Sequence, residues 1–283
     1  MAGEVSFTKM HGTGNDFIVL DGMRRSVRMT PALARRLCDR HFGVGADQIL
    51  ILLPSATADL RMRIVNADGS EVEMCGNGIR CLARYARDNG HVRRDDMTVE
   101  TLAGVVRPVL RKDGGVRVDM GAPILEAARI PTRARGRVIE RPLASLRNLK
   151  LRLPRSPLFF TCVSMGNPHA VIFMKGVEDL PADVWGPALE THPFFPRRTN
   201  VEFVEVTGPE TARVRVWERG AGLTMACGTG ACAVTVAGVL TGRLRRAAAL
   251  TLPGGVLRVE WAPDDHVYLT GPAEYVFRGR FFL

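Results

Sequence analysis

The sequence lacks the features that mark several large classes of protein. No part of its 283 residues approaches the roughly 18 consecutive apolar residues that a membrane-spanning helix needs. The N-terminal segment has no basic stretch followed by an apolar run, so no secretory signal is recognisable. We therefore expect a cytoplasmic protein with no membrane partner.

Metal-binding and phosphate-binding motifs are also missing. No CxxC pair occurs, and no cysteine–histidine cluster has the spacing of zinc ligands. The glycine-rich segment "HGTGNDF" (11–17) lacks the GxxxxGK[ST] pattern of a phosphate loop. We expect a protein that binds no metal and no cofactor.

Lysine is scarce. Only four of the 39 basic residues are lysines, and with 29 acidic residues the net charge is +10. A basic chain is one indication of nucleic-acid binding. However, the densest arginine run, residues 129–155, has no aromatic residue on which a base could stack. We interpret this run as a solvated surface and expect no nucleic-acid partner, with an RNA- or DNA-binding protein as one alternative.

What the sequence does contain is an internal duplication. The segment "MCGNGIRCLARYARDNG" (74–90) aligns without a gap with "ACGTGACAVTVAGVLTG" (226–242), at an offset of 152 residues. Cys75 matches Cys227, and the Gly-x-Gly after each cysteine matches too. The same offset pairs three polar residues upstream: Asn15 with Asn167, Gln48 with Asn200, and Asn66 with Glu218. A constant register over most of each half indicates two related lobes.

The duplication predicts the domain organisation. We expect an N-terminal lobe of residues 1–122 and a C-terminal lobe of residues 123–273. The arginine- and proline-rich segment 123–157 contains strand-like pieces, "GRVIERPL" (136–143) and "LKLRLP" (149–154), so we assign it to the second lobe. Two copies are too few for a solenoid and suggest a pseudo-twofold arrangement with a cleft between the halves.

The local patterns predict an α+β fold, with many strands around one central helix in each lobe. Four helices are expected, at 31–41, 75–90, 180–190 and 227–242. The last is apolar on nearly all faces and should be buried. Runs rich in β-branched residues predict strands at 16–22, 48–52, 60–66, 170–175, 200–206, 212–218 and 256–262.

The paired cysteines stand at helix starts, where backbone N–H groups have no partner and the helix dipole is positive. Such a position can hold a carboxylate, and it should lower the pKa of a thiol. If the pseudo-twofold brings the two helix starts together, Cys75 and Cys227 face one bound carboxylate from opposite sides. One thiolate then removes the proton from the adjacent carbon while the other thiol protonates the opposite face. The result is inversion of an amino acid at its α-carbon, without a metal or pyridoxal.

The two lobes differ at positions that matter for this chemistry. Glu218 is acidic where the first lobe has Asn66, and only the second asparagine has a nearby histidine, His169. Glu218 and His169 are therefore candidates to adjust thiol protonation or to hold a substrate ammonium. Arg219 could bind a second carboxylate through its two-pronged guanidinium. A neutral polar lining suited to a small zwitterion is expected from Asn15, Gln48, Asn66, Asn167 and Asn200.

These residues occur in motifs that resemble the diaminopimelate epimerase family. The resemblance covers nearly the whole chain in the same order: "KMHGTGNDFIVLDG", "FGVGADQ", "NADGSEVEMCGNGIRC", "VSMGNPHAVIF", "NVEF", "WERGAG" and "ACGTGACA". It implies a pyridoxal-independent epimerase that interconverts L,L- and meso-diaminopimelate in lysine and peptidoglycan precursor synthesis. It also implies two lobes that each wrap a curved sheet around a central helix, a tail (274–283) that returns to the first lobe, and a homodimer.

The resemblance also implies roles for individual residues. Cys75 and Cys227 become the two acid/bases, assisted by His169 and Glu218. The substrate contacts become Asn15, Gln48, Asn66, Asn167, Asn200, Glu218 and Arg219. The carboxylate cradles become Gly76–Asn77 and Gly228–Thr229. In this family the two thiols can oxidise to an inactive disulfide.

One position departs from the family pattern, and two other enzyme or redox functions stay open. Leu223 stands where many members have glutamate, next to intact catalytic positions. Proline racemases and related epimerases have similar paired cysteines, so another amino acid is an alternative substrate. A redox protein could use the same two cysteines as a disulfide pair. We interpret the remaining cysteines as core residues: Cys38, Cys81, Cys162 and Cys232.

Overall fold

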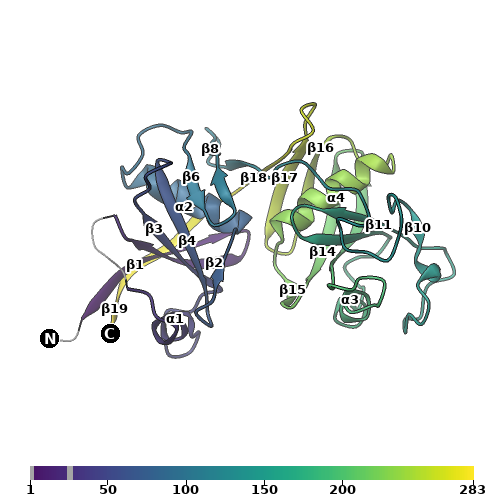
Figure 1. Cartoon of the computed structure of the whole chain (residues 1–283), viewed down its shortest axis with the longest axis horizontal. Helices are drawn as coiled ribbons and strands as arrows, with labels where there is room; N and C mark the ends of the chain where they lie inside the picture. The colour runs from purple at the N-terminus through teal and green to yellow at the C-terminus, as the bar shows by residue number, and fades with distance from the viewer. Residues whose placement is uncertain (1–2, 24–27) are drawn as a thin grey trace. The chain divides into compact units, whose positions relative to one another are not determined.

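The computed structural model describes residues 3–23 and 28–283 and divides the chain into two compact units (Figure 1). The first unit contains residues 1–119 and 270–283, and the second contains residues 120–269. The boundaries expected from the sequence fall a few residues away, at 122/123 and 273/274. No helix in the described part of the chain is long and apolar enough to cross a membrane.

The first unit is built on a mixed sheet that its own termini complete. The strand order is β19–β1–β2–β3–β4–β6–β7, with β5 paired to β4, and β8 pairs antiparallel with β9. The last strand of the chain, β19 (Glu274–Phe282), pairs antiparallel with the first, β1 (Glu4–Gly12). The other strands are β2 (Asn15–Asp21), β3 (Gln48–Leu53), β4 (Leu60–Asn66), β5 (Glu71–Val72), β6 (Val99–Thr101), β7 (Gly104–Val106), β8 (Pro108–Leu110) and β9 (Val116–Asp119).

The helices of the first unit begin and end where local chemistry requires. In α1 (Pro31–Cys38) the Thr30 hydroxyl accepts from the N–H of Leu33, and proline occupies the first helical position. In α2 (Gly76–Asp88) the Cys75 sulfur is the N-cap and accepts from the N–H of Gly78. Gly90 follows α2 at a φ of 75°, which suits a glycine beyond a helix end.

The second unit repeats this topology. Its strands run in the order β10–β11–β12–β13–β14–β16–β17–β18, with β15 paired to β14. Their bounds are β10 (Arg141–Pro142), β11 (Phe159–Ser164), β12 (Pro168–Phe173), β13 (Asn200–Gly208), β14 (Thr211–Glu218), β15 (Gly222–Thr224), β16 (Ala247–Leu252), β17 (Gly255–Trp261) and β18 (Val267–Gly271). In both units a parallel pair is followed by an antiparallel and then a parallel pair: β2–β3–β4–β6 and β12–β13–β14–β16.

The register of the strands repeats as well. Phe17 of β2 lies opposite Gln48 of β3, and the residues 152 positions later, His169 and Asn200, lie opposite each other in β12 and β13. The predicted α+β class and the two duplicated lobes are therefore confirmed.

The central helix of the second unit is buried on all sides. In α4 (Gly228–Leu240) nearly every residue is buried, and the helix packs among apolar residues of the surrounding strands, such as Val171, Val204, Val214 and Val216. Burying this helix stabilises the lobe by the hydrophobic effect and fixes the direction of its N-terminus. That N-terminus begins at Cys227, whose sulfur accepts from the N–H of Gly230.

Three local predictions differ from the structure. The predicted strand 149–154 does not form: Leu149, Leu151 and Leu153 pack against the core of the second unit, but their backbone joins no sheet. Of 136–143, only Arg141–Pro142 is a strand, followed by the short helix η1 (Leu143–Ser145). The helix expected at 31–41 ends at Cys38, because the Asp39 carboxylate accepts from the next N–H groups and forms a turn. The helix at 180–190 forms as α3 (Ala182–Glu190).

Candidate active site

The first unit gathers three of the predicted site residues around Cys75. The Cys75 sulfur is 3.7 Å from Asn15 Oδ1, to which it donates, and it accepts from the N–H of Gly78 at 3.4 Å. The side chain of Asn77 donates to the same Asn15 oxygen at 3.2 Å. A thiol, a carboxamide and a helix N-terminus with Gly76 as its first residue therefore lie together.

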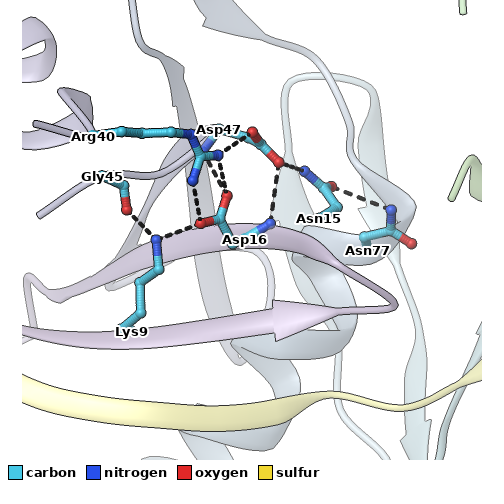
Figure 2. Close-up of polar contacts among 7 residues, drawn as sticks. All are labelled: Lys9, Asn15, Asp16, Arg40, Gly45, Asp47 and Asn77. Carbon is cyan, nitrogen blue, oxygen red and sulfur yellow. Dashed lines mark hydrogen bonds and ion pairs between the residues drawn. The ribbon is translucent and has the colours of Figure 1, made fainter. Parts of the chain in front are cut away.

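A charged network lies behind Asn15 (Figure 2). The Asn15 Nδ2 donates to the Asp47 carboxylate at 2.7 Å, and Arg40 bridges Asp47 to Asp16 with bonds of 2.7 and 2.8 Å. The buried Lys9 ammonium donates to Asp16 at 2.6 Å and to the carbonyl of Gly45. Burial raises the pKa of Asp16, but hydrogen bonds and charge from Arg40 and Lys9 outweigh it and lower that pKa to about 2. Asp16 therefore stays ionised at neutral pH.

Two further predicted residues bond to each other in the same unit. Gln48 donates from Nε2 to Asn66 Oδ1 at 2.9 Å across β3 and β4. Asn66 in turn donates to the hydroxyl of Ser70 at 2.9 Å. Both residues stand at strand ends, Gln48 at the start of β3 and Asn66 at the end of β4.

The second unit builds a related arrangement around Cys227. The Thr229 hydroxyl lies 3.4 Å from the Cys227 sulfur, and Asn167 Nδ2 donates to that hydroxyl at 3.2 Å. Gly228 and Gly230 begin α4, so the backbone at this helix start carries no side chain on either position. A Cβ at Gly230 would lie 2.8 Å from the Glu202 carboxylate and 3.4 Å from the Cys227 sulfur, so glycine is required there.

His169 lies behind Asn167 and is completely buried. Its Nε2 is 3.0 Å from Asn167 Oδ1, and its Nδ1 is 2.6 Å from Glu202 Oε1, on the neighbouring strand β13. Glu202 is also fully buried, between Val171 and Val216 on the adjacent strands. A carboxylate in this apolar surrounding is stabilised only by a charged or donating partner, which His169 supplies.

Glu218 ends β14 beside the same thiol. It accepts from the Thr224 hydroxyl at 2.6 Å and from the Cys227 thiol. Burial raises the pKa of Glu218, and these two hydrogen bonds and the nearby His169 oppose that rise. Because its charged form is disfavoured, Glu218 can accept a proton from Cys227 more readily than an exposed carboxylate could.

Arg219 follows Glu218 in the sequence and is bonded to Asn200. The side-chain oxygen of Asn200 accepts from the backbone N–H of Arg219 at 2.8 Å, while its Nδ2 donates to the Pro168 carbonyl at 2.9 Å. The exposed guanidinium of Arg219 donates to the carbonyl of Arg197 at 3.2 Å. In this structure Asn200 thus joins β12 to the loop that carries Arg219. Leu223, on β15, is 44% exposed.

The expected lowering of thiol pKa at a helix start is wrong for Cys227. Burial raises the pKa of its thiol well above the ordinary value, and the negative charges of Glu218 and Glu202 raise it further. The hydroxyl of Thr229 and the N–H of Gly230 lower it, as the sequence predicted, but their effect is smaller. Helix geometry therefore acts on Cys227 in the expected direction while desolvation dominates.

The other four cysteines are buried, as predicted for core residues. Burial raises the pKa of Cys38 to about 11 and that of Cys81 to about 12, and it raises that of Cys162 further. These thiols are therefore protonated and inert at neutral pH. Among the described residues, no three histidine, cysteine or acidic side chains are grouped to hold a metal ion.

Several residues that contact the site were not singled out from the sequence. Asp47, Asp16, Arg40 and Lys9 hold Asn15, and Glu202 holds His169. Glu202 could have been found, because it stands two residues after Asn200 on one strand and so faces the same side. The residues of the ion network come from separate segments of the chain, so no local sequence pattern predicts that they meet.

The fold and the two half-sites define a class of two-lobed proteins with a cysteine at the start of a central helix in each lobe. A PhzF-family phenazine biosynthesis protein from Bacillus anthracis shares this fold with a TM-score of 0.73 at 16% identity, over 99% of this chain and 100% of that one. A hydroxyproline epimerase from Agrobacterium vitis, solved with trans-4-hydroxy-L-proline, has a TM-score of 0.68 at 15% identity, over 100% and 94% of the two chains. These similarities concern the fold alone.

Sequence similarity identifies the family within this class. The sequence model of diaminopimelate epimerase matches residues 7–126 and 161–276. Diaminopimelate epimerases from Desulforudis audaxviator and Moorella thermoacetica are 56% and 53% identical to this chain, in each case over 98% of it and 99% of the relative. The chain belongs to the diaminopimelate epimerase family.

Proposed function

We propose that this protein epimerises L,L-diaminopimelate to meso-diaminopimelate by two-base proton transfer, as an isomerase of lysine and peptidoglycan precursor synthesis. The observation that carries the proposal is the repetition of one catalytic unit, a cysteine that caps a glycine-led helix, in both lobes of a chain of this family. Family membership also argues against the nucleic-acid-binding and redox alternatives. No observation favours another amino acid as substrate.

The reaction requires one sulfur on each face of the α-carbon. The thiolate of one cysteine takes the α-proton, and the thiol of the other gives its proton to the opposite face, so one proton leaves the substrate and one arrives. The sulfurs end with exchanged protonation states. In the second lobe Glu218 accepts the proton of Cys227, and the hydroxyl of Thr229 stabilises the thiolate that remains.

The helix starts and amide side chains suit a zwitterionic substrate. The N–H groups that begin α2 and α4, at Gly76–Asn77 and Gly228–Thr229, would bind the carboxylate beside the reacting carbon and the negative charge that develops there. Arg219, exposed at its tip, would bind the distal carboxylate. The remaining contacts would come from Asn15, Gln48, Asn66, Asn167, Asn200 and Glu218.

Proton exchange tests this function. Reduced enzyme is incubated with L,L-diaminopimelate in deuterated water without pyridoxal phosphate, and the α-proton signal and the meso isomer are followed by NMR. We expect deuterium at the α-carbon and formation of the meso product. Cys75→Ala and Cys227→Ala should each lower turnover by at least about 100-fold, because each removes one of the two proton-transfer groups.

A matched cysteine variant separates this effect from a general loss of thiols. Cys38→Ala removes a buried thiol of the first unit whose sulfur has no place in the mechanism, and it should retain turnover. Absence of both exchange and meso product with the wild-type enzyme would contradict the substrate assignment. Normal turnover in either Cys75→Ala or Cys227→Ala would contradict the two-thiol mechanism.

We also propose that the protein acts in the cytoplasm as a homodimer. The support for a dimer is the exposure of apolar side chains on β19, the terminal strand in the order of the first sheet: Val276, Phe277 and Phe282 are 53%, 48% and 70% exposed. Sedimentation equilibrium gives the mass directly. A monomeric mass of 31.0 kDa at micromolar concentration would contradict the dimer.

A further inference from the structure

The duplicated asparagines Asn15 and Asn167 occupy matching positions, but their amides are turned in opposite directions. An asparagine side chain accepts at its oxygen and donates at its nitrogen, so its orientation decides which kind of group it offers to a neighbour. In the first unit the oxygen of Asn15 faces the thiol side, and in the second unit the nitrogen of Asn167 does.

Asp47 determines the orientation in the first unit (Figure 2). Asp47 Oδ2 accepts from the backbone N–H of Asp16 and from the amide nitrogen of Asn15, which faces it at 2.7 Å. The Asn15 oxygen is then left to accept from Cys75 and Asn77. Asp47 is itself held by Arg40 and by the backbone N–H of Asp16.

Glu202 determines the orientation in the second unit, through His169. The nitrogen of Asn167 donates to Thr229, so only its oxygen is available to His169 Nε2, which must donate. The other ring nitrogen, Nδ1, lies 2.6 Å from Glu202 Oε1, and this contact holds the ring with Nε2 toward Asn167. Among the described residues, none hydrogen-bonds the other carboxylate oxygen, Glu202 Oε2.

The two orientations have opposite consequences at the sulfurs. In the first unit the Cys75 thiol donates its hydrogen to Asn15 Oδ1. In the second, the Cys227 thiol donates to Glu218, so the Thr229 hydroxyl, which accepts from Asn167, gives its own hydrogen to the Cys227 sulfur, 3.4 Å away. An acceptor favours a protonated sulfur, and a donor favours a thiolate.

We propose that Asp47 and Glu202 are positioning residues that hold Asn15 and Asn167 in opposite orientations, so that the first lobe presents an acceptor to Cys75 and the second a donor to Cys227. The use of this polarity in catalysis rests on the proposed function. Two-base inversion needs one sulfur that carries a proton and one that can lose it, and identical half-sites would not distinguish them. The donor is placed where burial and Glu218 most oppose a thiolate.

Alkylation of the individual cysteines tests the proposal without using the substrate, so its failure is distinguishable from failure of the proposed function. Reduced, substrate-free enzyme is treated with iodoacetamide between about pH 6 and 10, and each cysteine is quantified by peptide mass spectrometry, since only the thiolate reacts. The variants are Asp47→Asn and Glu202→Gln. Their matched controls, Asp88→Asn and Glu205→Gln, each remove one carboxylate from the same unit without contact to Asn15 or Asn167.

The expected effects are opposite in sign and confined to one cysteine each. Asp47→Asn lets the Asn15 amide turn and withdraw its acceptor, so Cys75 should react roughly three- to tenfold faster at a given pH. An amide at position 202 can either accept from Nδ1 of His169 or donate to it, so Glu202→Gln no longer holds Nε2 as the donor to Asn167. Asn167 is then free to turn, the donor at Thr229 is weakened, and Cys227 should react roughly three- to tenfold more slowly. The controls should leave both rates unchanged.

Charge alone predicts a different pattern. The negative charge of Glu202 raises the pKa of Cys227, so if charge were its only effect, Glu202→Gln would make Cys227 react faster. For Cys75 the charge control is Asp16→Asn, which removes a carboxylate from the same network but leaves the Asp47–Asn15 contact. Faster Cys227 in Glu202→Gln, an equal Cys75 effect in Asp16→Asn, or equal changes at both cysteines would overturn the proposal.

Two further measurements keep the proposal falsifiable if Glu202→Gln does not fold. In the wild-type enzyme, the ¹⁵N signals of His169 should show a hydrogen on Nε2, and a ring without a hydrogen on Nε2 would overturn the assignment to Glu202. Thr229→Val removes only the last donor, so it should slow alkylation of Cys227 as Glu202→Gln does while the His169 signals stay unchanged. An unchanged Cys227 rate in Thr229→Val would likewise overturn it.

Discussion

At the scale of the residue, the Cys227 thiol is subject to opposing influences. The helix start and Thr229 stabilise a negative sulfur, while burial and the two nearby carboxylates destabilise it more strongly. The thiol is therefore protonated in the substrate-free lobe, and Glu218 is the carboxylate placed to take its proton. Asp16 shows the reverse outcome, because its cationic partners outweigh its burial.

Asp16 predicts an acid-dependent part of the stability. Its pKa falls from the model-compound value of 3.8 to about 2 in the folded protein, which corresponds to about 2 kcal/mol of stability. Because the folded pKa is depressed, this stability is fully present above about pH 4 and is lost as the pH falls through about 2. Asp16→Asn should lower the free energy of unfolding by about 2 kcal/mol at pH 7, measured with urea, and the difference should shrink between pH 4 and 2.

The exposed pair of Arg84 and Asp88 provides the comparison for Asp16. Asp88→Asn breaks an ion pair one helical turn apart on the surface of α2, so it should change stability by less than about 0.5 kcal/mol. A difference between wild type and Asp16→Asn that stays constant from pH 7 to 2.5 would contradict the role of the Asp16 charge.

At the scale of the element, α3 supports the loop that carries Arg219. Trp217 donates from its indole to Glu190 at 2.7 Å, and the other oxygen of Glu190 accepts from the backbone N–H of Gly220 at 3.0 Å. The helix can approach this closely only because it has a glycine where it meets the indole ring. A Cβ on Gly186 would lie 2.3 Å from that ring.

Gly186→Ala should therefore force α3 away from β14. We expect a loss of stability of roughly 1–3 kcal/mol, typical of overpacking in a core, and a raised KM because the Arg219 loop loses its support. Urea unfolding and steady-state kinetics measure the two effects. Val184, on the same helix, is 55% exposed. Val184→Ala should therefore change the free energy of unfolding by no more than about 0.5 kcal/mol and leave KM unchanged. Equal effects of the two substitutions would contradict the packing argument.

At the scale of the whole molecule, the chain closes its first unit with its last strand. β19 pairs along β1, and the ring of Phe277 meets that of Phe7 edge to face at 5.7 Å. Upstream of β19, the carbonyl of Pro272 accepts from Arg80, a fully buried arginine of α2. The first lobe is thus complete only when the end of the chain has been added.

Removing residues 274–283 should loosen the first unit selectively. The backbone of β1 loses its β19 partners, so amide hydrogen exchange should accelerate in peptides of 4–21, while peptides of α4 and β13 stay protected. Mass-spectrometric exchange measures both. Removing Leu283 alone, which lies beyond β19, should leave both regions protected. Uniform acceleration across the chain, or none, would contradict a local role of the strand.

Much of the fold could be predicted because its signals are local. The glycines after each central helix, the proline that begins α1 and the β-branched runs act within a few residues. The prediction failed at 149–154 because alternating leucines indicate a buried face, whereas strand formation also needs a hydrogen-bonding neighbour that only the tertiary structure provides. It failed at the end of α1 because one Asp39 side chain decided the turn.

The sequence by itself determined the duplication, the cysteine at each helix start and the family, because these depend on residue type and register along the chain. Only the tertiary structure decided which carboxylate meets which asparagine, how Asn15 and Asn167 are turned, and that burial outweighs the helix start at Cys227. The physical reason is that hydrogen-bond direction and desolvation depend on groups from separate strands. Asp47 and Glu202 act on the site through contacts between segments that are distant in sequence. Their spacing from the cysteines along the chain therefore does not predict these contacts.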